Sequence, residues 1–154
     1  MYFWNIEALK RQIVSNRLNE ADRFVYAFIN IMFGVITFEL FHVPMPENPS
    51  IYDRLASLLN ILTVAVGTYL AYKANGAVKG EDFLGRFFSL SFVVTVRFSV
   101  LLIPVLIVLS FFDSLLSGNG EGFTSILLEV LVFALWTILL YGNIIKHIGE
   151  VRTT

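Results

Sequence analysis

The sequence predicts an all-α integral membrane protein, with four transmembrane helices in an antiparallel bundle preceded by an N-terminal amphipathic helix. Apolar residues make up 56% of the 154 residues and gather into four runs. Each run is near or above the ~20 residues that a helix needs to cross ~30 Å of hydrocarbon. The runs are too long, and alternate too poorly between apolar and polar residues, to be strands of a membrane barrel.

One membrane domain is expected over residues 1–154. The four expected spans follow the apolar runs, at residues 20–42, 51–73, 83–112 and 123–146. We interpret the first run as a retained span rather than a cleaved signal peptide, because charged residues precede it and no small-residue cleavage site follows it. Asn19 followed by Asp22 resembles a capping box, which places the start of the first span near Glu20.

Residues 1–19 are predicted to form a cytoplasmic interfacial helix. Ile6, Leu9 and Ile13 recur at helical spacing on one face, and Lys10 and Arg11 lie off that face. Two interpretations fit this pattern equally. The helix binds anionic lipid at the membrane surface, or it forms a lid packed on the cytoplasmic mouth of its own bundle.

The positive charges predict which side of the membrane each segment faces. Most of the basic residues lie in the N-terminal segment, the middle loop and the C-terminal tail: Lys10, Arg11, Arg17, Arg23, Lys73, Lys79, Arg86, Lys146 and Arg152. The first and third connections together contain only Arg54. The positive-inside rule therefore places both termini and the middle loop in the cytoplasm, which in a bacterium means a multi-pass protein of the inner membrane.

Small and polar residues mark the helix faces that should contact protein, because apolar side chains gain nothing by leaving lipid. The second span has such a face at heptad spacing. We predict a helix-packing seam there, formed by Ser57, Asn60, Gly67 and Ala71. In the third span, Arg97 and a hydroxyl face of Ser91, Thr95 and Ser99 point in different directions. A lone bundle hides only one such face well, which favours an oligomer.

Arg97 lies deep in its span, where an arginine costs ~2.5–3.5 kcal/mol on insertion scales. Depth along the helices predicts an intramembrane polar cluster of Asn30, Asn60, Arg97 and Glu129, with Glu129 as the ion-pair partner of Arg97. The cluster has two interpretations. It fixes the register of the helices, which we favour slightly, or it lines a path for a small anion or a proton.

A metal site and an enzyme active site find little support in the sequence. Glu39 and His42 have the i,i+3 spacing of carboxylate metal sites, but those sites use two such motifs and further carboxylates. A histidine at the interface among solvated acids is the simpler interpretation. The chain has no cysteine and a net charge of −1, and it contains no Ser-His-Asp set, H-E-x-x-H or P-loop motif. We expect no metal, no cofactor and no nucleic-acid partner.

These observations predict a small non-enzymatic membrane protein that acts as an association module or an accessory subunit of a membrane complex. Its expected partners are the lipid bilayer and either further copies of itself or another membrane protein. The alternative is an oligomeric channel or transporter subunit, for a small anion or a proton, with Arg97 in the path.

Overall fold

The computed structural model describes residues 2–40, 51–116 and 123–153, except for the side chains of 37–40, 109, 112–116, 123–129 and 153. The described chain is all-helical, as predicted. Its elements are α1 (Ile6–Val14), α2 (Glu20–Leu40), α3 (Ile51–Ala74), the short 3₁₀ helix η1 (Ala77–Lys79), α4 (Phe83–Leu116) and α5 (Phe123–Thr153). The four long helices begin where the apolar runs predict, and α4 and α5 continue beyond their predicted ends at residues 112 and 146.

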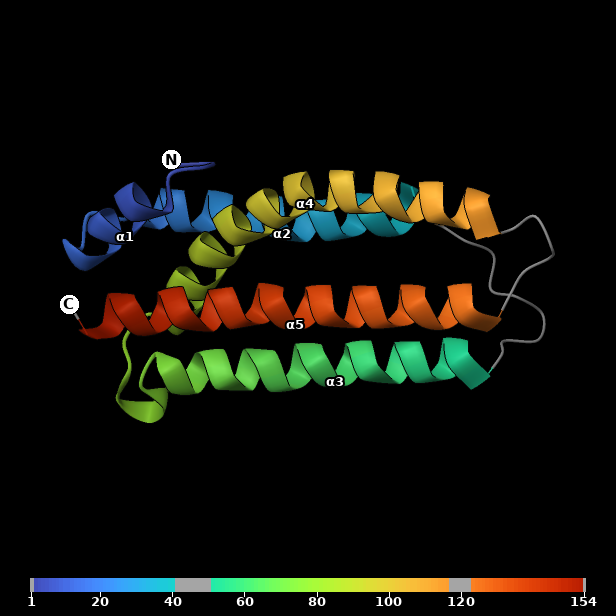
Figure 1. The fold of residues 1–154 in the computed structure, drawn as a ribbon. Helices are drawn as coiled ribbons and strands as arrows, with labels where there is room; N and C mark the ends of the chain where they lie inside the picture. The colour runs from blue at the N-terminus through green and yellow to red at the C-terminus, as the bar shows by residue number, and fades with distance from the viewer. Residues whose placement is uncertain (1, 41–50, 117–122, 154) are drawn as a thin grey trace.

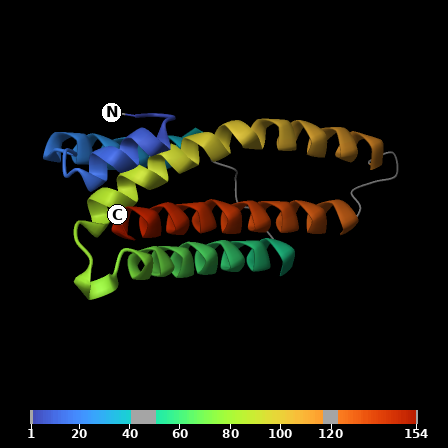
Figure 2. The same cartoon turned by 60° about the vertical axis from the view of Figure 1, so that its left-hand side comes forward.

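The long helices form two layers (Figure 1). One contains α3 and α5, and the other contains α2 and the C-terminal half of α4. The first turns of α4 cross obliquely from the layer of α3 and α5 to the other layer, and the view turned by 60° shows the same crossing (Figure 2). Packing runs from α3 to α5, from α5 to α4 and from α4 to α2. Within the described ranges α2 and α3 do not pack along each other.

Three segments are long and apolar enough to cross a membrane: Ile51–Ala74, Phe83–Val108 and Val130–Arg152. They are compatible with the predicted membrane location. The remaining predicted span, residues 20–42, is not confirmed in the described part of the chain. Its last two residues lie outside that part. Large apolar side chains on the outside of these segments remain exposed, as lipid-facing residues do; Ile61 is 65% exposed and Ile107 is 64% exposed.

The buried core lies at one end of the molecule, where α1, α2, α4 and α5 meet. Its fully buried members include Leu9, Tyr26, Leu90, Val93 and Ile148. The chain ends marked in Figures 1 and 2 lie toward this same end. The helices therefore pack closely at one end of the molecule, while side chains such as Val100 and Leu101 in the C-terminal half of α4 stay exposed.

Two local signals position the helices at the core end. The Asn19 side chain accepts a hydrogen bond of 2.7 Å from the Asp22 amide, so the predicted cap begins α2. Between α3 and α4, Gly76 has a φ of 105°, a conformation that favours glycine. The side chain of Asn75, which is fully buried, accepts a hydrogen bond from Arg86 and donates one to the Glu81 carbonyl, which ties this connection to α4.

Candidate functional site

Arg97 on α4 is bound by the N-terminal arm, which we define as residues 2–5. Its Nε donates a hydrogen bond of 2.9 Å to the Trp4 carbonyl, and an Nη group donates a second one to the same oxygen. The guanidinium carbon lies 5.6 Å from the centroid of the Trp4 ring, within the range of a cation–π interaction. Because Trp4 precedes α1, its carbonyl takes no part in the hydrogen bonding of that helix.

The N-terminal arm is also held by α2 and by a second residue of α4. The Tyr2 amide donates a hydrogen bond of 2.7 Å to the Tyr26 hydroxyl, which donates one of 3.1 Å back to the Tyr2 carbonyl. The Phe3 ring meets the Phe92 ring edge-on, with 5.7 Å between the centroids. The arm thus supplies backbone groups and aromatic surface to side chains of α2 and α4.

The amphipathic helix α1 packs on its own bundle. Of the two arrangements expected for residues 1–19, the structure has the one in which the helix lies against the bundle as a lid. Its apolar residues Ile6, Leu9 and Ile13 are buried, and the helix contacts α4 and α5. Lys10 forms ion pairs with Glu7, at 2.7 Å, and with Glu150 of α5. Burial alone would lower the pKa of Lys10, but the bonds to these two carboxylates outweigh burial and raise it. The residue therefore stays charged at neutral pH.

The predicted polar cluster is not joined into one network among the described residues. Asn30 donates hydrogen bonds of 3.0 Å to the Tyr26 carbonyl and 2.9 Å to the Phe88 carbonyl, which links α2 to α4. Arg97 binds Trp4, and within the described part of the chain no hydrogen bond or ion pair connects either residue to Asn60. The Glu129 side chain lies outside the described residues, so its pairing with Arg97 stays a prediction.

The inner half of the predicted seam on α3 packs against α5. Gly67 and Ala71 are buried, and a Cβ atom added to Gly67 would overlap the Tyr141 ring of α5. Glycine is needed at this position because any side chain would push the aromatic ring away. The small residues on α3 thus allow the close approach that drives helix association in lipid.

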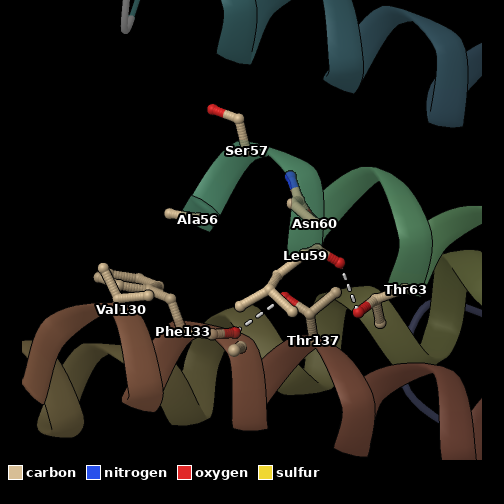
Figure 3. Close-up of a pocket in the computed structure, with 9 residues that line it drawn as sticks. Ala56, Ser57, Leu59, Asn60, Thr63, Val130, Phe133 and Thr137 are labelled. Carbon is tan, nitrogen blue, oxygen red and sulfur yellow. Dashed lines mark hydrogen bonds between the residues drawn. The ribbon is translucent and has the colours of Figure 1, made fainter. Parts of the chain in front are cut away.

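The outer half of the seam is exposed. Ser57 and Asn60 are both exposed, and their side chains point away from α5, toward the side on which α2 lies (Figure 3). By contrast, Thr63 donates a hydrogen bond of 2.8 Å to the Leu59 carbonyl of its own helix, and Thr137 donates one of 2.9 Å to Phe133. Within the described chain, neither Ser57 nor Asn60 has a hydrogen-bond partner.

A hollow of about 430 Å³ lies between α3 and α5 beside these two residues. It is lined by residues of both helices, which comprise small or hydroxyl-bearing ones, one asparagine and three larger apolar ones: Ala56, Ser57, Leu59, Asn60, Thr63, Val130, Phe133, Ala134 and Thr137. The two helices therefore fit less closely here than at Gly67. This exposed face of α3, which we call the Ser57–Asn60 face, is the candidate site.

The structure does not test the predicted metal site of Glu39 and His42. The Glu39 side chain and the whole of His42 lie outside the described residues. Within the described ranges, no three His, Asp or Glu residues gather closely enough to hold a metal ion.

The contact between Trp4 and Arg97 was not predicted from the sequence. Helical periodicity reports on faces of regular helices, whereas the atom that binds Arg97 is a backbone carbonyl in a non-helical segment. The available signal was a pair of aromatic residues, Phe3 and Trp4, directly before an amphipathic helix. Three comparisons with known proteins add no relative: no family model, no curated protein and no solved structure matches the chain.

Proposed function

We propose that this chain is a small, non-enzymatic, multi-pass membrane protein that serves as an association module or accessory subunit of a membrane complex. In this proposal α2 is a fourth span, and both ends of the chain and the η1 connection lie in the cytoplasm. The distribution of Lys and Arg supports that orientation. The three long apolar segments support a location in the membrane.

The Ser57–Asn60 face is the observation that carries the proposal. An amide or hydroxyl that faces lipid forgoes the hydrogen bonds that it would make in water, which costs free energy. The other two asparagines of the described spanning helices avoid that cost, since Asn30 binds α4 and Asn143 donates to the Leu139 carbonyl. A polar side chain of a neighbouring helix would satisfy Asn60 in the same way.

The contacts of α4 favour a structural role for Arg97 over a place in a transport path. Its guanidinium is engaged by the Trp4 carbonyl and ring, so the N-terminal arm supplies the partners of the charge. On the hydroxyl face, Ser91 is buried and donates to the Phe88 carbonyl, whereas Ser99 is exposed. The support for association therefore comes more from α3 than from the two faces of α4.

Photo-cross-linking in the native membrane tests the proposed function. A photoreactive amino acid at Ser57 is expected to give a covalent adduct with a second protein chain, seen as a band of higher mass. The same probe at Leu55, about 200° around the helix at ~100° per residue, is expected to give adducts with lipid alone. Leu55 is 49% exposed, so it is a matched surface position on α3. Adducts with lipid alone at both positions would contradict the proposal.

A further inference from the structure

We infer that the partner of the Ser57–Asn60 face is a second copy of this chain, packed through the outer half of α3 about a twofold axis. The inference rests on the proposed function and adds the identity of the partner. The inner half of the same helix is already occupied, because Gly67 and Ala71 pack against α5. Contact between two copies is therefore confined to the part of α3 around Ser57 and Asn60.

The chemistry of Asn60 favours a copy of itself as partner. A carboxamide carries both a donor group and an acceptor oxygen. Two Asn60 side chains related by a twofold axis can therefore exchange two hydrogen bonds, because the interface presents the same surface from both sides. The exposed Ser57, one turn away, offers a hydroxyl that can pair in the same symmetric manner. No charged side chain of a different protein is needed to satisfy these groups.

The spacing along α3 also suits pairing between two like helices. Ser57, Asn60 and Val64 follow one another at three and four residues, the spacing of positions in a heptad seam. Val64 is 41% exposed, so the exposed part of the seam continues beyond Asn60. In coiled coils a single asparagine in such a seam specifies the register and the number of helices. We assign that role to Asn60 in the pairing of two copies.

Disulfide cross-linking tests the inference, and the absence of native cysteine makes it free of background. Ser57→Cys in membranes treated with a mild oxidant is expected to yield a covalent dimer of this chain. Leu55→Cys, on the far side of α3, is expected to stay monomeric. Two copies carrying different tags are expressed together, so that a mixed disulfide identifies both partners as this chain.

A second substitution tests whether the Asn60 amide holds the two copies together. In the Ser57→Cys background, Asn60→Leu is expected to lower the cross-linked fraction about fivefold, because it removes the paired hydrogen bonds. Adding Leu58→Asn restores an amide to α3, but about 200° away from position 60, and is expected not to restore the dimer. An unchanged helical circular dichroism spectrum in each variant confirms that the chain still folds.

The outcomes separate this inference from the proposed function. If Ser57→Cys gives no dimer of this chain while the photoreactive probe at Ser57 labels a protein of another mass, the second copy is wrong and the association function stands. If Ser57→Cys gives no dimer and the probe labels lipid alone, both are wrong. A dimer that is equally strong with Asn60→Leu overturns the role of the amide pair.

Discussion

At the scale of single residues, the environment of Arg97 is set by a segment far away in the sequence. An arginine in an apolar helix needs acceptors for its N–H groups, and a backbone carbonyl outside a helix can supply one, as a carboxylate can. Trp4 supplies that carbonyl and also a ring for the cation. The charge can thus be accommodated without an acidic partner, and the arm becomes part of the packed structure around α4.

Removing the charge should release the arm. In a Phe3→Cys/Phe92→Cys variant, we expect a short bis-maleimide that spans the space left by the two rings, whose centroids are 5.7 Å apart in the parent, to give an intrachain cross-link. Adding Arg97→Leu should lower its yield several-fold, because the Trp4 carbonyl loses its donor. Ser99→Leu, at an exposed position of α4, is the control and should leave the yield unchanged. Equal yields in all three would show that Arg97 does not hold the arm.

At the scale of elements, α1 is attached by its apolar face and by one ion-pair cluster. Leu9→Asn should detach it, because an amide without partners would replace a fully buried side chain at a cost of ~2–5 kcal/mol. We expect trypsin added to inside-out vesicles to cleave after Arg11 much faster in this variant. Val14→Asn, at a position 41% exposed on the same helix, should be cleaved at the parent rate. Matching rates would argue against docking through Leu9.

The contact between α3 and α5 depends on the absence of a side chain at one position. Gly67→Ala should destabilise the fold by ~1–3 kcal/mol, because the new Cβ overlaps the Tyr141 ring. Gly142→Ala is a matched control, since nothing lies within 4 Å of a Cβ there. It should be neutral or slightly stabilising, as alanine is the better helix former. Unfolding in mixed detergent micelles measures both, and equal stabilities would refute the close contact.

At the scale of the whole molecule, the orientation in the membrane is open to a direct test. We expect Glu47→Cys, in the first outer connection, to react with an impermeant maleimide in intact cells. Val78→Cys, which replaces a side chain of η1 that is 91% exposed, should react only after the membrane is opened. The cysteine-free parent is the blank. The opposite pattern would invert the topology that the basic residues predict.

The sequence predicts the helices better than it predicts their contacts. Length and hydropathy place the starts of all four long helices, and Asn19 marks the start of α2, because these are local properties of the chain. The seam of Gly67 and Ala71 is also visible in the spacing of small residues. The binding of Arg97 by Trp4 is not, because it joins residues 93 positions apart through a backbone atom that has no pattern in the sequence.

Energy transfer between two copies in a bilayer tests the central claim, that two copies of this chain pair through the Ser57–Asn60 face of α3, most directly. Labels at Val78→Cys lie away from the Ser57–Asn60 face, so they leave it intact. In liposomes of decreasing protein density, we expect transfer in the parent to stay above the level for randomly placed molecules. Asn60→Leu should reduce it to that level. Parent and Asn60→Leu proteins that both follow the random level at every density would contradict the claim.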